Sequence, residues 1–213
     1  MSRITSILFL GALAVIFFYA PIEKEQGVVQ KIFYIHVSSA ITMYLGYGIA
    51  FLAALMFLLG KSRIWDEVAV SAAEVGFFLN TAVLLTGPFW AKATWGAWWV
   101  WDPRITSTAL MWLLYAAYLV MRSYLATDTR GRTITSVLLV VDLLVVPLVH
   151  FSVKLWRGMH PPQGILTPRM LVTMAVTIVA VLLLGATLFR ARFRLERSRT
   201  LLESVQLKAS ENS

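Results

Sequence analysis

Six long apolar stretches limit what this sequence can fold into. A helix needs about 20 mostly apolar residues to cross the hydrocarbon core of a bilayer. We therefore predict an all-α integral membrane protein with six transmembrane helices, forming one domain over residues 1–190 and followed by a basic cytoplasmic tail, residues 191–213. The predicted helices cover residues 4–21, 37–59, 68–89, 105–122, 134–152 and 170–189.

The composition supports a membrane protein. Hydrophobic residues make up 59% of the chain and charged residues only 14%, whereas an ordinary soluble domain has about 25% charged residues. The net charge of +8 would suggest nucleic acid in a soluble protein. Here the basic residues fall at the ends of apolar runs and in the tail, so we predict the lipid bilayer as the partner surface and no nucleic acid. The chain has no cysteine, which excludes disulfides and thiolate metal sites.

The distribution of positive charge predicts the orientation. Twelve Lys and Arg residues fall on the side of the two termini and seven on the opposite side. The positive-inside rule then places both termini in the cytoplasm. The first stretch has Phe18 where a signal peptidase needs a small residue, so we expect a retained helix rather than a signal peptide. We expect the tail to continue as a basic helix along the inner leaflet and to act as a topology anchor.

A tryptophan-rich loop is predicted on the outer side, between the third and fourth helices. If the segment is helical, Trp95, Trp98, Trp99 and Asp102 share one face; if it is extended, Trp95, Trp99 and Trp101 do. Either arrangement predicts a flat aromatic surface suited to a large planar ligand. An interfacial aromatic belt is the alternative interpretation, although five of the eight tryptophans fall between residues 90 and 101.

All three histidines are predicted to lie on this outer side. His36 stands at the outer end of the second helix and His160 in the last outer segment. Together with the tryptophans, they predict two axial ligands of a haem, with haem b as bound cargo. Because imidazole binds iron only when it is deprotonated, haem affinity should fall in acid. We assign His150 a packing or hydrogen-bonding role, with a third ligand as the alternative, and prefer His160 to Met159 as a ligand.

The residues that follow the tryptophans have both structural and functional interpretations. Asp102 and Pro103 are the residue types favoured at the N-cap and first position of a helix, so they predict the start of the fourth helix. Arg104 is either an interfacial cation or a partner for a haem propionate. Four further cations on this side are candidate propionate partners: Lys31, Lys92, Lys154 and Arg157.

The segment Trp95-Gly-Ala-Trp-Trp-Val-Trp-Asp-Pro-Arg104 resembles the "WWD" motif of the haem-handling proteins of cytochrome c maturation. Chain length, helix number and the positions of the motif and histidines resemble CcmC, the haem exporter protein C family, over residues 1–190. The resemblance implies that His36 and His160 are axial ligands and that Trp95, Trp98, Trp99, Trp101 and Asp102 contact haem. The chain departs from the family where Val37 replaces the usual Pro and Pro161 the usual Gln.

The resemblance also implies a function and partners. Such proteins lie in the inner membrane of a bacterial cell, where they bind haem at the periplasmic face. They present it to the haem chaperone CcmE, together with the ABC exporter subunits CcmA and CcmB; CcmD is a further candidate subunit. The chain has no Gly-rich phosphate loop, so we predict a transfer protein rather than an enzyme, with any ATP hydrolysis in a partner. The alternatives are a membrane b-type cytochrome that carries electrons and a scaffold whose tryptophan loop only docks partners.

Overall fold

The computed structural model describes residues 3–155 and 166–211, with the backbone alone for His150 and for residues 152–155, 207–208 and 211. The described residues form an α-helical bundle. The helices are α1 (Arg3–Ala14), α2 (Lys31–Gly60), α3 (Arg63–Trp95), α4 (Pro103–Leu125), α5 (Thr129–Asp142), α6 (Val145–Leu155) and α7 (Pro168–Glu211). A π-helical turn, Val15–Tyr19, continues α1, and a short 3-10 turn, Val28–Gln30, precedes α2.

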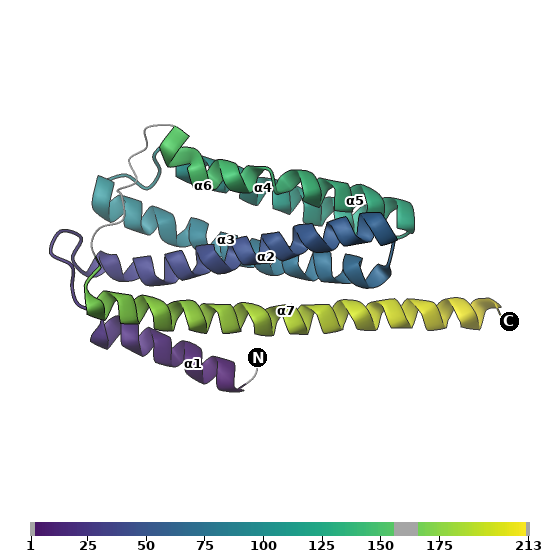
Figure 1. Cartoon of the computed structure of the whole chain (residues 1–213), viewed down its shortest axis with the longest axis horizontal. Helices are drawn as coiled ribbons and strands as arrows, with labels where there is room; N and C mark the ends of the chain where they lie inside the picture. Colours follow the sequence, from purple (N-terminus) through teal and green to yellow (C-terminus); the bar gives the residue numbers. More distant parts are fainter. Residues whose placement is uncertain (1–2, 156–165, 212–213) are drawn as a thin grey trace.

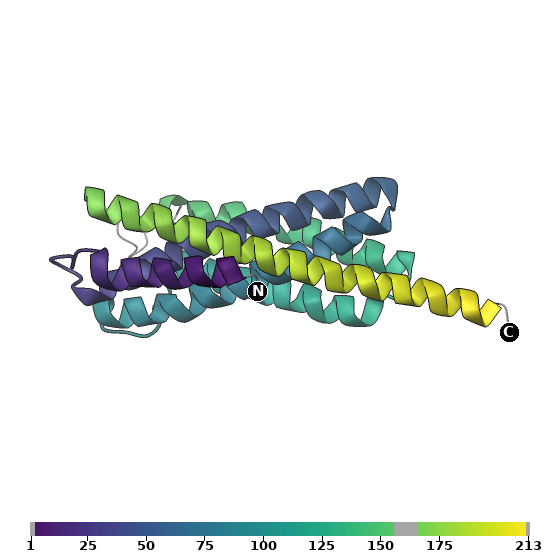
Figure 2. The ribbon, with the colours of Figure 1, turned by 90° about the horizontal axis from the view of Figure 1, so that it is seen from below.

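The helices are arranged around a central antiparallel pair, α2 and α3 (Figure 1). Helices α4, α5 and α6 lie on one side of this pair and α7 on the other. Helix α1 packs on α7, as Figure 2 shows from below, and Thr5 Oγ1 lies 2.9 Å from Thr187 Oγ1. The bundle is therefore layered: α4, α5 and α6 form one layer, α2 and α3 the next, and α7 follows, with α1 outermost.

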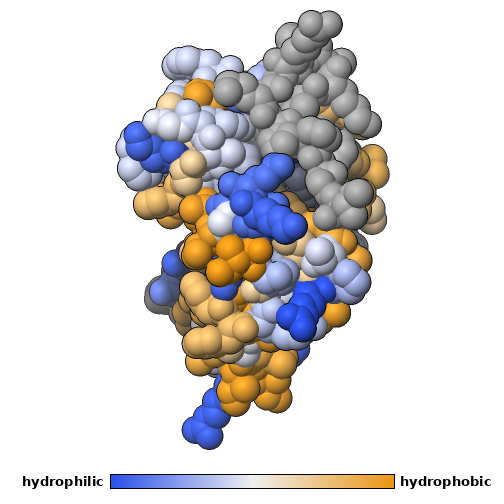
Figure 3. All heavy atoms as spheres, turned by 90° about the vertical axis from the view of Figure 1, so that its left-hand side faces the viewer, coloured by the Kyte–Doolittle hydropathy of each residue, from blue (hydrophilic) through white to orange (hydrophobic). Residues whose placement is uncertain are grey.

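The bundle has two chemically different ends. One carries residues 96–102, the segment 20–30 and the start of α7, and is here called the tryptophan end. The opposite end carries the α2–α3 and α4–α5 turns and the extension of α7, and is here called the arginine end. Seen face-on, the tryptophan end has orange apolar side chains beside pale and blue ones (Figure 3). This end is therefore a mixed surface on which apolar groups are accessible.

Five helical segments are long and apolar enough to cross a membrane: Val28–Gly60, Arg63–Trp95, Pro103–Leu125, Thr129–Val149 and Pro168–Gln206. The prediction of a multi-spanning membrane protein is thereby supported. The first predicted span corresponds to Arg3–Tyr19, which has 17 residues. At 1.5 Å per residue this helix is about 25 Å long, slightly less than the hydrocarbon core of about 30 Å. Six spans and cytoplasmic termini thus stay predictions.

Small residues bring α2 and α3 into close contact. A Cβ atom on Gly46 would lie 3.1 Å from the Cα of Gly76, and one on Gly76 would lie 2.6 Å from Cδ1 of Tyr47. Close approach through Gly and Ala is typical of helix pairs in membranes, where apolar surface alone gives no driving force for association. The same interface buries six alanines, namely Ala50, Ala53, Ala54, Ala69, Ala72 and Ala73.

The fifth predicted helix is interrupted near its middle. Helix α5 ends at Asp142 and α6 begins at Val145, so the prediction of one helix over 134–152 is wrong. Pro147 explains the interruption, because proline lacks an N–H and its ring clashes with the carbonyl four residues earlier, that of Leu143. The Val146 N–H donates to the Leu143 carbonyl at 3.0 Å, which closes a tighter turn.

The tail continues α7 without a break at residue 190. The helix has 44 residues, which gives a length of about 66 Å, and it extends past the α2–α3 turn (Figure 1). The prediction of a helical tail is correct, and its course along the inner leaflet stays a prediction. Two of its arginines form ion pairs with α3: Arg192 with Glu74, and Arg197 with Glu67 at 3.3 Å.

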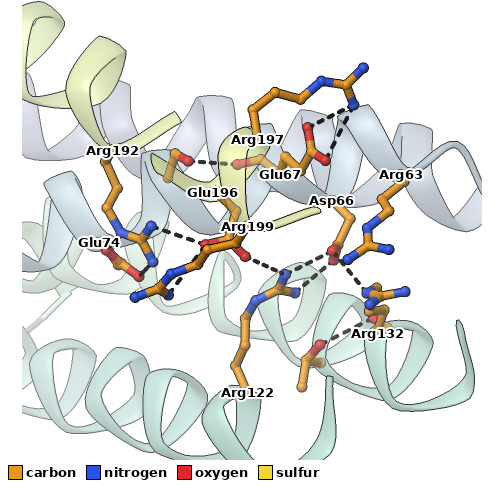
Figure 4. A network of polar contacts seen from close by, with 12 residues as sticks. Arg63, Asp66, Glu67, Glu74, Arg122, Arg132, Arg192, Glu196, Arg197 and Arg199 are labelled. Carbon is orange, nitrogen blue, oxygen red and sulfur yellow. Dashed lines mark hydrogen bonds and ion pairs between the residues drawn. The ribbon is translucent and has the colours of Figure 1, made fainter. Parts of the chain in front are cut away.

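These pairs belong to a network at the arginine end (Figure 4). At its centre Arg122 of α4 donates to both carboxylate oxygens of Asp66 of α3, at 2.6 and 2.7 Å. Arg132 of α5 lies 3.5 Å from the same carboxylate, and Arg122 lies 4.0 Å from Glu196 of α7. The cations that we interpreted as topology anchors therefore also cross-link four helices.

Candidate functional site at the tryptophan end

Helix α3 ends within the tryptophan-rich segment. We predicted that this helix ends at residue 89. It instead includes Pro88 without a break and ends at Trp95. Gly96 follows with φ +76°, a left-handed conformation that glycine adopts without strain at a helix C-terminus. The Lys92 ammonium group donates to the Gly96 carbonyl at 2.8 Å. Residues 96–102 are not helical, so the helical version of the tryptophan prediction is wrong.

The indole rings form edge-to-face pairs. Trp90 packs on Trp95 with ring centroids 5.1 Å apart, and Trp99 packs on Trp101 at 5.9 Å. Trp98 packs on Phe89 at 5.4 Å. The interplanar angles of 81° to 83° reflect the preference of aromatic quadrupoles for edge-to-face contact. One flat aromatic surface is therefore not formed, contrary to our expectation.

The loop nevertheless presents indole rings to the exterior. Trp98 is 55% exposed and Trp101 is 82% exposed. Large exposed apolar groups gathered in one place indicate a contact surface for a ligand, a membrane or a partner. The loop therefore offers ring faces that a planar ligand could cover.

Asp102 ends the loop as the N-cap of α4. Its Oδ1 accepts a hydrogen bond from the Arg104 N–H at 2.9 Å, and Pro103 occupies the first helical position. The side chain is buried. The predicted capping role is confirmed. The loop is thus fixed at both ends, by Gly96 with Lys92 at its start and by Asp102 at its end.

His36 is the sixth residue of α2, whereas the sequence predicted a helix that begins just after it, at residue 37. Its Nδ1 is 2.8 Å from Oγ1 of Thr86 on α3. The same hydroxyl lies 2.8 Å from the Ala82 carbonyl, to which it donates its one proton. The hydroxyl oxygen must then accept from the Nδ1–H of His36, so the neutral imidazole carries its lone pair on Nε2. A histidine whose second nitrogen is fixed in this way is typical of metal ligands.

The other predicted site residues are only partly described. His160 and Met159 lie outside the described residues, and the side chain of His150 on α6 is not described. Arg104 is half-buried and interacts electrostatically with the Tyr44 hydroxyl of α2. This interaction indicates that Arg104 faces α2, the helix that carries His36.

Two of the candidate propionate partners contact the backbone. Lys31 donates to the Phe17 carbonyl at 2.6 Å and thereby links the start of α2 to the π-helical turn. Lys92 holds Gly96, as described above. Both lysines thus have structural roles at the tryptophan end.

The sequence analysis missed two residues at this end. Thr86 positions the His36 ring, and Gln26 accepts a hydrogen bond from Trp90 Nε1 at 3.0 Å. Thr86 precedes Gly87-Pro88, a pair of residues that often marks irregular backbone in a helix. That pattern could have drawn attention to the segment, but the pairing of Thr86 with His36 depends on the register of α2 against α3.

These features define a polytopic helical membrane protein with exposed tryptophans and an oriented histidine at one end. The family model described as "Heme exporter protein C" matches residues 1–212, and the chain belongs to this family. It is 30% identical to heme exporter protein C of Bradyrhizobium diazoefficiens over 195 residues, which cover 88% of this chain and 74% of the relative. It is 31% identical to heme exporter protein C of Escherichia coli strain K12 over 185 residues, 84% of this chain and 74% of the relative. It is 29% identical to heme exporter protein C of Haemophilus influenzae over 185 residues, which cover 84% of this chain and 75% of the relative. The resemblance inferred from the tryptophan motif is confirmed.

Proposed function

We propose that this protein binds haem at its tryptophan end and delivers it for cytochrome c maturation. The observation that carries the proposal is the imidazole of His36, whose Nδ1 is held by Thr86 at 2.8 Å at the end of the bundle that exposes the tryptophans. The names of the relatives, heme exporter protein C, support haem as the cargo. The protein acts by binding and release, without a catalytic nucleophile or base.

The residues have distinct roles in this proposal. His36 binds the iron through Nε2, and His160 supplies the second axial ligand. The exposed rings of Trp98, Trp99 and Trp101 pack against the porphyrin, exchanging edge-to-face contacts among themselves for stacking on the ligand. Arg104, which faces α2, pairs with a propionate through charge-assisted hydrogen bonds.

The delivery step requires partners on both sides of the membrane. The excess of positive charge at the arginine end supports an orientation with that end in the cytoplasm of a bacterial cell and the tryptophan end in the periplasm. Haem is then presented to the chaperone CcmE, and the ABC subunits CcmA and CcmB, with CcmD, act on the same complex. Contact with CcmE shifts the balance between haem held and haem released.

Spectroscopy of the purified protein tests the binding step. The protein is purified from a haem-replete host, and its Soret and visible bands are recorded. We expect a low-spin spectrum in the wild type, loss of most haem in His36→Gly, and recovery of the low-spin spectrum when imidazole is added to that variant. His150→Ala is the matched control and should keep its haem. Retention of wild-type haem by His36→Gly would show that His36 is not an axial ligand.

A transfer assay separates haem delivery from the two alternatives. Haem-loaded protein is mixed with purified CcmE, and covalent haem on CcmE is followed by in-gel haem staining. Transfer is expected with wild-type CcmE and not with a CcmE variant that lacks its haem-binding histidine. Stoichiometric, non-transferable haem that quinone oxidises rapidly would instead establish a b-type cytochrome. Absence of any Soret band in the wild type would favour the scaffold.

A further inference from the structure

A cluster of buried polar side chains lies in the interior of the bundle, away from both ends. Tyr47 of α2 stacks on Tyr115 of α4, with ring centroids 3.6 Å apart and an interplanar angle of 21°. Asn80 of α3 donates through Nδ2 to the Tyr47 hydroxyl at 3.2 Å. Asp142, the last residue of α5, interacts electrostatically with both tyrosines. All four residues are buried, and we call them the mid-bundle polar cluster.

The cluster lies at mid-membrane depth. Each of its residues, 47, 80, 115 and 142, falls within two residues of the midpoint of an apolar stretch in the sequence. Ionisable side chains at this depth are rare because they are costly to remove from water, and those that occur usually serve ion or proton binding. Asp142 is the ionisable group that needs explanation, since tyrosine is neutral at physiological pH.

Three atoms of the cluster lack a hydrogen-bond partner among the described residues. They are Asp142 Oδ2, the Tyr115 hydroxyl and Asn80 Oδ1, and each is shielded from solvent. Buried polar atoms of folded proteins are nearly always satisfied by protein or by ordered water. Three such atoms, contributed by α3, α4 and α5, leave hydrogen-bonding capacity in the interior that a small polar ligand such as water can satisfy.

The protonation state follows from the available donors. An ionised Asp142 would be a buried charge with only acceptor atoms and no ion pair among the described residues, since Arg122 of α4 is already paired with Asp66. A protonated Asp142 adds a donor beside the Tyr115 hydroxyl. Water then completes the set, because each water molecule can donate to Asn80 Oδ1 and accept from the two hydroxyl groups.

The interruption between α5 and α6 provides independent support. Leu143 keeps right-handed helical dihedral angles, φ −63° and ψ −25°, but the hydrogen bonding changes directly after Asp142, where the Leu144 N–H donates to the Val141 carbonyl at 3.0 Å. The Val146 N–H, which would reach the Asp142 carbonyl in a continuous helix, donates to the Leu143 carbonyl instead. Irregular backbone at membrane depth is tolerated where it is buried in protein or lines a hydrated cavity. The break therefore coincides with the unpartnered carboxyl group.

We propose that the mid-bundle polar cluster binds a proton and water, with Asp142 carried as the neutral acid. The groups that face it are Tyr47 from α2, Asn80 from α3 and two tyrosines of α4, Tyr115 and Tyr118. Tyr118 also interacts electrostatically with the Arg122–Asp66 pair, which gives the site a polar connection to the arginine end. The side chain of His150 lies outside the described residues, and the proposal does not depend on it or on haem.

Infrared spectroscopy tests the proton. The protein is prepared in lipid with its aspartates isotopically labelled at the carboxyl carbon. We expect the wild type to show a label-sensitive C=O band of a protonated acid at neutral pH, absent in Asp142→Asn. Asp128→Asn is the control, because Asp128 is exposed and caps α5, and should leave the band unchanged. A wild-type spectrum with carboxylate bands only would overturn the proposal.

Radiolytic footprinting tests the water. Hydroxyl radicals formed from bound water modify adjacent side chains even when these are buried. We expect Tyr115 to be modified several-fold faster than Phe57, an aromatic side chain of α2 that is also buried. Modification of Tyr115 at the rate of Phe57 in the wild type would mean that the cluster is dry, and this comparison needs no variant. Asp142→Leu should reduce the Tyr115 rate to that of Phe57.

Discussion

The Arg122–Asp66 pair should be the most important polar contact at the arginine end. Its two hydrogen bonds of 2.6 and 2.7 Å join side chains that are only 9% and 2% exposed. Replacing one partner of such a buried pair costs about 3–5 kcal/mol, because the other charge is left uncompensated. In Arg122→Met, Asp66 keeps Arg132 at 3.5 Å, so we expect the lower value, about 3 kcal/mol.

This loss is large enough to measure as a melting temperature. For a chain of this length each kcal/mol lowers Tm by about 2–4 °C, so Arg122→Met should melt about 6–12 °C below the wild type. Intrinsic tryptophan fluorescence in detergent follows the transition. The matched control is Arg63→Met, which removes an exposed pair with Glu203, 36% and 55% accessible, worth about 0–1 kcal/mol.

A second variant keeps the test interpretable. Asp66→Asn combined with Arg122→Met removes both charges of the pair but also takes Asp66 from Arg132, so the double variant should lose less stability than the sum of the two single changes. The reasoning fails if Arg122→Met melts no lower than the Arg63→Met control. It also fails if the double variant is destabilised by the full sum of the two single changes.

Three further changes test the tryptophan end. Thr86→Val removes the hydroxyl that positions His36 and should weaken haem binding about 10–100-fold in titrations, whereas Thr94→Val, whose hydroxyl bonds a helix carbonyl, should leave affinity unchanged. Asp102→Ala removes the N-cap of α4 and should cost about 1 kcal/mol, seen as a Tm lower by a few degrees; an unchanged Tm would mean that the cap adds nothing. Trp99→Ala should lose about 1 kcal/mol of stacking, roughly a fivefold weaker haem affinity, with Tm unaltered; a large fall in Tm would contradict its role at the surface.

Local features of the sequence predicted much of the fold. Apolar length and composition are properties of single segments, so the helices were found to within a few residues of their observed ends, apart from the longer α2, α3 and α7. Asp102-Pro103 predicted the start of α4 because capping depends only on neighbouring residues. The interruption after Asp142 also has a local cause in the sequence. Pro147 lies within the apolar run and could have been used to predict two helices in place of the fifth.

Contacts between distant segments could not be predicted in the same way. Arg122 and Asp66 are 56 residues apart, and Arg197 and Glu67 are 130 apart, so their pairing depends on how the helices are stacked. The partner of His36 on α3 depends on the same registers. The edge-to-face tryptophans depend on ring packing that side-chain spacing does not determine. Sequence analysis could therefore name candidate residues of the tryptophan end and still misjudge their arrangement.

Helix α3 has a mechanical consequence for the whole protein. Its first four turns carry Asp66, Glu67 and Glu74, which pair with arginines of α4, α5 and α7, and its last turns carry Thr86 and Trp95. A helix is stiff along its axis, so a displacement of these carboxylates is carried along α3 to Thr86, which orients His36, and to Trp95, where the loop begins. The arginine end and the tryptophan end are therefore mechanically coupled, because one continuous helix contributes residues to both.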